Sequence, residues 1–357
     1  MGDSYPKLKA AAVQAAPVFL DREATVEKAC RLIHEAADHG AQLIAFPEGF
    51  IPAHPNWFHF HPATSRVASA LSIDLYKNAV EVPSPQTEAL CQAARAAGAY
   101  VVVGLCEKLP HTMGTMFNTQ LYIGPDGQVL GKHQKTMPTV GERLVHMGGY
   151  GDTFGAFNTE FGPASALICG ENSNPLAVFA LTAEGTRVHV MSWPPHFSPT
   201  GQSMRSTVLI SAQSFAEVAK AYVISSCGTV DEHMIEMLQV SSADEALLRD
   251  EKLIGGSAIV APDSRVIAGP MGAEEGILYA ELDLESAILL KLRQDFAGHY
   301  NRPDIFQVRI NRTAPLIYAE QQALPERATL KPATSPAPQL VSGDGGMLPP
   351  ATNAALG

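Results

Sequence analysis

The chain has 357 residues, 46% of them hydrophobic and 17% charged, and it carries a net charge of −11. This length and composition predict one or two compact domains and argue against disorder of the whole chain. The acidic balance argues against a nucleic-acid partner. The N-terminal residues hold no apolar run long enough for a signal peptide or a membrane span. Five scattered cysteines form no CxxC pair, so we expect a reduced, cytoplasmic protein without a membrane partner.

Strand-like and helix-like segments alternate from the first residues onward. The expected strands lie in residues 7–17, 41–48 and 100–109, and the expected helices in residues 22–40 and 85–99. Their apolar runs and helical spacings, with glycines at the helix ends, carry these predictions. Residues 116–135 then predict a hairpin that turns at Gly-Pro-Asp-Gly.

The second half of the chain repeats the alternation. Strands are expected in residues 164–169, 187–194 and 221–228, helices near 174–184 and 202–220, and a second hairpin in 255–270. Strands bounded by helices and mixed with hairpins predict an α/β layered domain with a mixed sheet. The end of the chain is rich in Pro, Ala, Gly and Ser. We therefore expect a folded domain over residues 1–324 and a disordered tail over 325–357.

Cys169 lies at a strand-to-helix corner, between an apolar run and a Gly-Glu-Asn turn. Such a thiol is placed like a nucleophile, although free cysteines are more often inert core residues. Glu48, Lys135 and Glu142 also follow strands or a hairpin, and strand ends in α/β folds converge on a shared crevice. Each charge alone is typical of a solvated loop residue. Together they favour an active site.

These residues resemble a known pattern. Glu48 in FPEGF, Lys135 in HQKTMPT and Cys169 in LICGENSNP resemble the Glu-Lys-Cys triad of the nitrilase superfamily, in the family's order. The segment PTVGERLV is similar to the one that carries the family's second active-site glutamate, here Glu142, and DFAGHYNRPDIF near residue 300 resembles the nitrilase branch. The resemblance implies a four-layer α-β-β-α sandwich of the carbon-nitrogen hydrolase type with mixed sheets. It also implies homodimers that build larger homo-oligomers, spirals or helical filaments.

Two positions depart from the family pattern. Nitrilases commonly carry Trp directly after the cysteine, where this chain has Gly170, and Trp after the Glu-Arg-Leu-Val stretch, where it has His146. Both changes remove aromatic bulk, so we expect a roomier pocket and an aromatic or arylaliphatic nitrile rather than hydrogen cyanide. Trp57 and the pair Trp193-Pro194 are predicted as pocket walls.

The resemblance implies hydrolysis of a nitrile to a carboxylic acid and ammonia, through a thioimidate and then a thioester on Cys169. A thiol with a pKa near ~8.5 is mostly protonated at neutral pH, so Glu48 would serve as general base. Lys135 would stabilise the charge that develops on nitrogen and oxygen. Glu142 would orient water or hold the lysine. The chemistry requires no metal or organic cofactor.

Other assignments stay open or rank lower. An amidase or carbamoylase of the same superfamily would share the triad, and a catalytically silent assembly or binding member would share the fold. His54, His59 and His61 do not have standard zinc spacing, and no cysteine or acidic residue stands nearby in the sequence. Cys227 also follows a strand but lacks the Gly-Glu-Asn turn, so it is the weaker candidate nucleophile.

Overall fold

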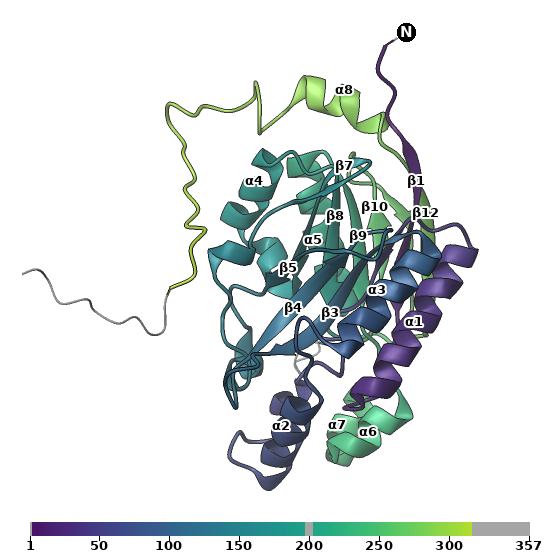
Figure 1. The fold of residues 1–357 in the computed structure, drawn as a ribbon, viewed down its shortest axis with the longest axis vertical. Helices are drawn as coiled ribbons and strands as arrows, with labels where there is room; N and C mark the ends of the chain where they lie inside the picture. Colours follow the sequence, from purple (N-terminus) through teal and green to yellow (C-terminus); the bar gives the residue numbers. More distant parts are fainter. Residues whose placement is uncertain (1, 197–202, 316–357) are drawn as a thin grey trace, which may run out of the picture. The chain divides into compact units, whose positions relative to one another are not determined.

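Two six-stranded sheets stand face to face in the computed structural model, which describes residues 2–196 and 203–315 (Figure 1). The first sheet has the order β12 (Gly276–Asp283), β1 (Lys7–Gln14), β2 (Leu43–Ala45), β3 (Tyr100–Lys108), β4 (Met116–Ile123) and β5 (Val129–Gln134). The second has the order β11 (Val266–Ala268), β10 (Ala258–Val260), β9 (Tyr222–Cys227), β8 (Val188–Trp193), β7 (Gly162–Ile168) and β6 (Phe157–Thr159).

Both sheets are mixed. Strands β1, β2 and β3 pair in parallel, whereas β12, β4 and β5 add antiparallel edges to them. In the second sheet β7, β8 and β9 are parallel, while β6 and the hairpin β10–β11 run antiparallel to their neighbours. Parallel strands at the centre of each sheet need cover on both faces. The predicted mixed-sheet α/β domain, including both hairpins, is confirmed.

Helices cover the outer face of each sheet. Against the first sheet lie α1 (Arg22–Asp38) and α3 (Pro85–Ala97), and against the second lie α4 (Pro175–Ala183) and α5 (Met204–Ala219). Local capping marks where they begin: the Asp21 side chain accepts a hydrogen bond from Ala24 N, and Ser84 with Thr87 forms a capping box for α3. The result is the α-β-β-α sandwich that the resemblance implied.

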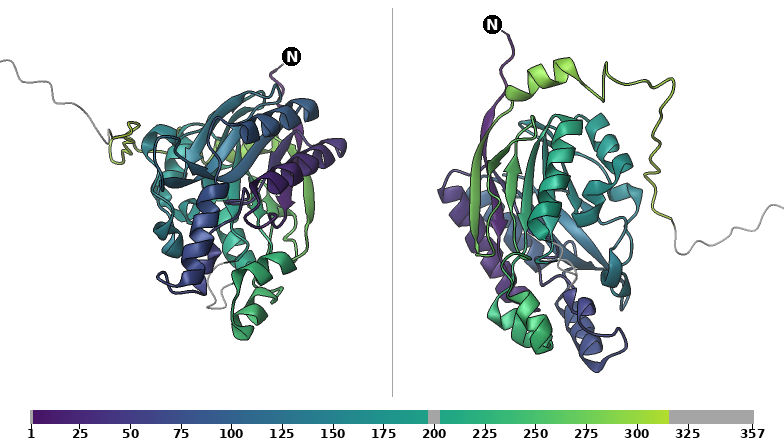
Figure 2. Two further views of the ribbon diagram at one scale, coloured as in Figure 1. Left: turned by 60° about the horizontal axis from the view of Figure 1, so that its bottom comes forward. Right: turned by 180° about the vertical axis from the view of Figure 1, so that it is seen from behind.

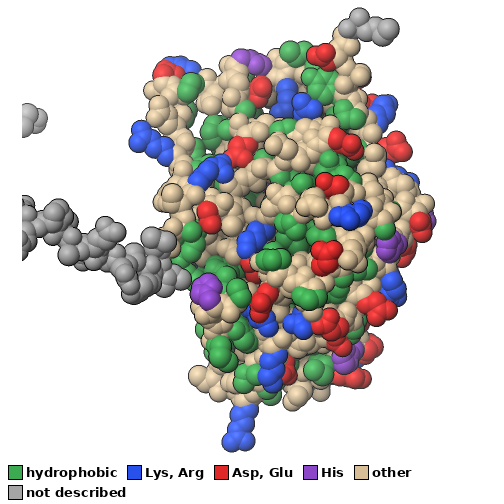
Figure 3. All heavy atoms as spheres, in the orientation of Figure 1, with side chains coloured by type: hydrophobic (Ala, Val, Ile, Leu, Met, Phe, Trp, Pro, Cys, Tyr) green, Lys and Arg blue, Asp and Glu red, His purple; other side chains and the backbone are tan. Residues whose placement is uncertain are grey.

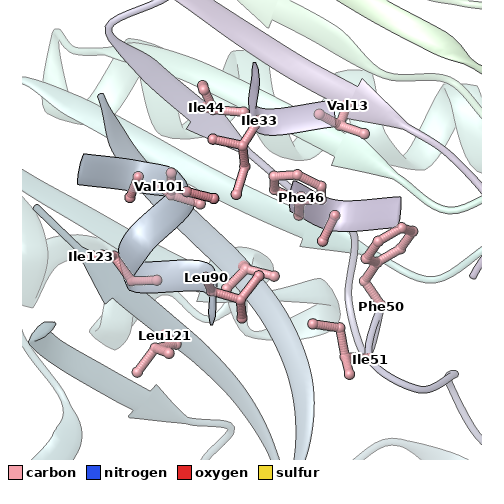
Figure 4. Packing of buried hydrophobic residues seen from close by; sticks show 14 of the residues in the cluster. Val13, Ile33, Ile44, Phe46, Phe50, Ile51, Leu90, Val101, Leu121 and Ile123 are labelled. Carbon is pink, nitrogen blue, oxygen red and sulfur yellow. The ribbon is translucent and has the colours of Figure 1, made fainter. Parts of the chain in front are cut away.

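Three layers of apolar side chains separate these four structural layers. Ala11 and Val13 of β1 point to the layer beneath α1 and α3, which Figure 4 shows from close by. Their neighbours Ala10 and Ala12 point to the layer between the sheets. Because successive strand side chains alternate in direction, one apolar strand supplies both layers. This explains why the central strands read as continuous apolar runs.

Further helices extend the sandwich at one end (Figure 2). They are α2 (Arg66–Asn78), α6 (Glu232–Leu238) and α7 (Ser242–Leu248), with short 3-10 helices η1 (Asn56–His59), η2 (Val140–Leu144), η3 (Gly151–Thr153) and η4 (Cys169–Ser173) elsewhere. The sequence pattern did not predict α2, α6 or α7. Helices α6 and α7 have 7 residues each, too few for a clear periodicity, whereas α2, with 13 residues, was missed. A last helix, α8 (Ser286–Arg293), follows β12 and leads into an exposed C-terminal segment.

A close approach in the first sheet positions the loop that follows β2. A Cβ atom at Gly104 of β3 would lie 2.1 Å from the carbonyl oxygen of Pro47, so only glycine lets this loop lie against β3. From the other side, Glu48 N donates to the carbonyl oxygen of Trp193 in β8, at 3.2 Å. The loop is therefore held between the two sheets.

The predicted domain end at residue 324 and the tail over 325–357 lie outside the described residues. Within the described part of the chain, no helix is both long and apolar enough to cross a bilayer. On the face drawn in Figure 3, basic and acidic side chains are interspersed.

Candidate active site

Four of the predicted residues sit where elements of the two sheets end. Glu48 follows β2, Lys135 directly follows β5, Glu142 lies within η2, and Cys169 begins η4 at the end of β7. All four are buried, with exposed fractions of 2%, 0%, 2% and 6%. The ion pairs among the first three show that residues far apart in the sequence converge here.

The ammonium group of Lys135 bridges two carboxylates. Its Nζ lies 2.7 Å from Glu48 Oε1 and 2.6 Å from Glu142 Oε2. A buried lysine would normally lose its charge, because burial disfavours the charged form. Here burial is outweighed by the negative charges of Glu48 and Glu142 and by the hydrogen bond to Glu142, and the pKa of Lys135 is raised. The lysine therefore stays positive throughout the neutral range.

Asn118 is a site residue that the sequence pattern did not reveal. From β4, its Nδ2 donates to Glu48 Oε1 at 2.7 Å and to Glu142 Oε1 at 3.1 Å. It is fully buried and lies across the sheet from Lys135, whose N–H donates to the Asn118 carbonyl at 2.8 Å. The signal available in the sequence was a run of three polar residues, Asn118 to Gln120, in the middle of a strand with apolar ends.

The two carboxylates differ in acidity. Burial, with the charge of Glu142, raises the pKa of Glu48 to about 7 against the attraction of Lys135. Burial acts the same way on Glu142, but hydrogen bonding to His146 and the charge of Lys135 hold its pKa below the ordinary range. Pairs of acids with separated pKa values are suited to different roles. Glu142 is a permanent anion, and Glu48 can exchange a proton near neutral pH.

Cys169 has a left-handed backbone, with φ of +52°. Such a conformation is rare for a residue with a side chain and places the thiol at a sharp strand-to-helix corner. Burial, with the charge of Glu48, raises the thiol pKa well above 9.0, while Lys135 and the backbone N–H of Gly170 oppose the rise. The thiol is therefore neutral at rest and needs a base. Glu48 Oε1 already accepts two bonds, whereas Oε2 has no partner among the described residues and remains able to accept a proton.

A cavity of about 240 Å³ opens onto the nucleophile. Its described lining combines catalytic, polar and apolar side chains: His54, His59, Thr139, Val140, Glu142, Cys169, Gly170, Ser173, Trp193, Pro194, His196 and Thr207. The predicted pocket residues Gly170, Trp193 and Pro194 are among them. Among the described residues, a Cβ added at Gly170 would meet only Thr139 Oγ1, at 3.8 Å, so glycine leaves space next to the thiol rather than satisfying a backbone constraint.

Two predicted pocket residues, Trp57 and His146, are not among the described residues that line this cavity. Trp57 is fully buried in the apolar cluster under α2, where its ring meets Phe19 edge-on at 6.4 Å, and it is not part of the described cavity lining. The large indole ring packs with apolar residues of α2, α6 and α7 at this end of the sandwich. His146 is buried behind Glu142, with Nδ1 3.5 Å from Oε1, so it acts on that carboxylate rather than on pocket width.

His54 lies close to two carboxylates, which the sequence analysis did not expect. Glu48 precedes His54 closely in the sequence, and the fold places the His54 ring nitrogen within 4.8 Å of carboxylate oxygens of both Glu48 and Glu142. These three groups resemble a ligand set, yet the ammonium of Lys135 already bridges the two carboxylates. A cation there would have to displace a buried, hydrogen-bonded lysine, so the residues fit the lysine better than a metal.

The rival thiol lies apart from this cavity. Cys227 is fully buried at the end of β9, and its backbone N–H donates to Ser257 Oγ at 3.0 Å. Burial raises the pKa of its thiol, and no charged residue among the described ones offsets that effect. Cys169 is therefore the better nucleophile.

Comparison with known proteins agrees with this geometry. The carbon-nitrogen hydrolase family profile matches residues 9–292. The chain belongs to the carbon-nitrogen hydrolase family. It is 36% identical over 316 residues to a nitrilase of a Bacillus species, covering 87% of this chain and 90% of that protein. It is also 34% identical to an arylacetonitrilase of Aspergillus niger, over 88% of this chain and 98% of the other.

A solved member of the nitrilase superfamily has the same fold. Nit3 of Saccharomyces cerevisiae superimposes with a TM-score of 0.60 at 21% identity, over 80% of this chain and 94% of that chain. This likeness supports the α-β-β-α sandwich fold of the chain. The candidate site residues rest on the contacts described above.

The raised pKa of Glu48 predicts the pH dependence of activity. Only the carboxylate form can take the thiol proton, so kcat/KM should fall about tenfold per pH unit on the acid side, with a midpoint near the Glu48 pKa of about 7. A pH-rate profile with a neutral substrate measures this. A midpoint near the ordinary value of 4.5 would contradict the assignment of Glu48 as the titrating base.

Replacing Asn118 should move that midpoint. Asn118→Leu removes a hydrogen bond that favours the Glu48 carboxylate, so the pKa of Glu48 should rise and the acid limb should shift upward by roughly 1 pH unit. Gln120→Leu is a matched control, because Gln120 is equally buried on β4 but donates to Leu167 O and Ser192 Oγ instead. Equal shifts in both variants would show that Asn118 has no special role.

Proposed function

We propose that this carbon-nitrogen hydrolase is a nitrilase, which converts an organic nitrile and two waters into a carboxylic acid and ammonia. The observation that carries the proposal is a thiol at a cavity, beside a buried ammonium held by two carboxylates of different pKa. A nitrile carbon is a weak electrophile, so it requires a thiolate and a fixed positive charge near the developing anion. The relatives named above support the nitrile as substrate.

The first half of the reaction forms a thioimidate. Glu48 takes the thiol proton as the Cys169 sulfur bonds to the nitrile carbon, and one C–N π bond becomes a lone pair on nitrogen. Glu48 then returns the proton to that nitrogen. Lys135 stabilises the growing negative charge, and the N–H of Gly170 lies beside the nucleophile as a second donor.

The second half consumes two waters. The first adds to the thioimidate carbon, losing a proton to Glu48, and the tetrahedral species expels ammonia after protonation of its nitrogen. A thioester remains, and a second water, activated by Glu48, releases the acid and restores the thiol. Glu142 holds Lys135 in place through both halves, at 2.6 Å. Loss of the thiolate instead of ammonia would release an amide, which we expect as a minor product beside the acid.

The cavity favours an aromatic or arylaliphatic nitrile over hydrogen cyanide. Gly170 leaves space beside the nucleophile, and Trp193 and Pro194 supply an apolar wall. An amidase or carbamoylase would use the same residues, because both reactions pass through the same thioester. A silent binding protein would have no need for a buried lysine beside a thiol, since burying charge costs stability.

A paired substrate panel tests the function. We expect aromatic and arylaliphatic nitriles to give mainly acid, a minor fraction of amide, and slow turnover of the matched amides. Cys169→Ala should fold and lose turnover, whereas Cys227→Ala should retain it. The measurement is ammonia, acid and amide, all quantified for each substrate. Faster hydrolysis of amides than of matched nitriles would favour the amidase, and activity in folded Cys169→Ala would exclude this nucleophile.

We further propose a cytoplasmic homodimer that builds larger homo-oligomers or spirals. Five free cysteines support a reducing compartment. Exposed apolar side chains on the outer helices of the second sheet support pairing: Leu176 of α4 and Ile210 of α5 are 63% and 68% exposed.

A single charged substitution on α5 tests the proposed dimer surface. Ile210→Glu should disrupt the dimer, because a carboxylate would be buried in a self-complementary interface. Light scattering after size exclusion measures the mass. Ile73→Glu on α2 is the control, since Ile73 is similarly exposed, at 55%, on another face. An unchanged mass for Ile210→Glu would contradict this surface.

A further inference from the structure

Glu171 lies two residues after the nucleophile and carries a buried carboxylate with an unusual number of donors. Its Oε1 accepts from Thr136 N at 2.8 Å and from Thr136 Oγ1 at 2.5 Å. Its Oε2 accepts from His133 Nε2 at 2.9 Å and from Ile168 N at 3.2 Å. With both oxygens saturated, Glu171 is anchored as firmly as the catalytic carboxylates, although it does not line the cavity among the described residues.

The donors come from the two sheets. Ile168 is the last residue of β7 and directly precedes the nucleophile. His133 and Thr136 flank Lys135 in sequence, at the end of β5 in the other sheet. One carboxylate therefore joins the backbone that presents the thiol to the strand end that presents the ammonium.

We propose that Glu171 is a positioning residue that sets the separation between the Cys169 thiol and the Lys135 ammonium. The proposal rests on Cys169 being the nucleophile of the function proposed above. Glu171 touches neither reacting atom and acts through the two segments that it joins.

The turn at Cys169 needs such anchoring, because its left-handed backbone at φ +52° is unfavourable for a residue with a Cβ. Asn172 holds the other side of the same turn: its Nδ2 donates to Cys169 O at 2.9 Å, and its Oδ1 pairs with His189 Nε2 at 2.9 Å. Asn172 thus fixes the turn to its own sheet through β8. Among the described residues, the hydrogen bonds of Glu171 tie it to the strand end that carries Lys135.

The charge of Glu171 is matched to this role. Burial would raise its pKa, but His133 and the Thr136 donors outweigh burial and lower it. The group is therefore a carboxylate, and His133 Nε2 must donate to it. A glutamine has one acceptor oxygen in place of two, so its amide group would face donors and some of the four bonds would be lost.

Loosening this connection has a defined electrostatic consequence. Lys135 lowers the pKa of the Cys169 thiol, against the effects of burial and of Glu48. Coulomb attraction falls with distance. If Lys135 and Cys169 move apart, the thiol pKa rises and the thiolate forms only at higher pH.

The experiment is the pH dependence of Cys169 alkylation by iodoacetamide, followed by mass spectrometry of the Cys169 peptide in the full chain. For Glu171→Gln we expect the midpoint to move upward by roughly half a pH unit or more. Turnover per alkylatable Cys169 should fall by roughly 10- to 100-fold, with KM nearly unchanged. A role in stability alone would lower the amount of folded protein but not the midpoint.

Glu107→Gln is the matched control. Glu107 on β3 is also a buried carboxylate, and it accepts from Gln134 Nε2 at 2.9 Å and from Lys132, both on β5, but it does not contact the nucleophile turn. We expect this variant to lose stability and to keep the alkylation midpoint. An equal midpoint shift in Glu107→Gln would overturn the proposal, because it would show a general effect of β5.

A second pair of variants applies if Glu171→Gln does not fold. His133→Leu removes one donor to the carboxylate, whereas His133→Gln retains an N–H in its place. We expect a raised midpoint in the leucine variant and recovery in the glutamine variant. Unshifted midpoints in folded Glu171→Gln or His133→Leu would overturn the proposal. Alkylation needs no nitrile, so a failure of the nitrilase assignment would appear only in the turnover assay.

Discussion

The buried ammonium of Lys135 is the constraint on which the site depends. Removing a charge from water costs several kcal/mol, and that cost is offset only when oppositely charged partners are held in good geometry. Glu48 and Glu142 supply those partners at 2.7 and 2.6 Å, and Asn118 donates to both of them. The same burial that makes this arrangement costly raises the pKa of Glu48 into the neutral range and keeps the Cys169 thiol protonated. Burial therefore sets the pKa values of Glu48 and Cys169, between which the proton is transferred.

The two-sheet architecture makes this geometry possible. The first sheet carries Lys135, Asn118 and the segments that hold Glu48 and Glu142. The second sheet carries Cys169 on a turn with a left-handed backbone. Strands buried on both faces form rigid supports, and the loop after β2 is held between the sheets because Gly104 permits a close approach. Glu171 also connects the two sheets. Its carboxylate, on the turn after β7, accepts hydrogen bonds from residues at the end of β5.

The sequence was sufficient to predict most of the helices and strands and the chemical groups of the candidate site. Apolar runs and capping residues predicted the central strands, both hairpins and the main helices, because these signals are local. The order of Glu48, Lys135, Glu142 and Cys169 at element ends predicted a shared site. The helices α2, α6 and α7 were not predicted; they pack on the apolar cluster that includes Trp57, which only the fold assembles.

Which side chains meet was decided by the tertiary structure alone. Asn118 looks like any polar residue in a strand, and it becomes part of the site only because β4 lies beside β5. Trp57 was expected at the pocket and lies in the core, whereas His54 was expected to lack acidic neighbours and has two. The sequence by itself determined the central strands, the hairpins, the main helices and the order of the candidate site residues, because residue type and local pattern carry that information. Pairing across sheets, depth of burial and the resulting pKa values depend on contacts between distant segments, so only the fold decided them.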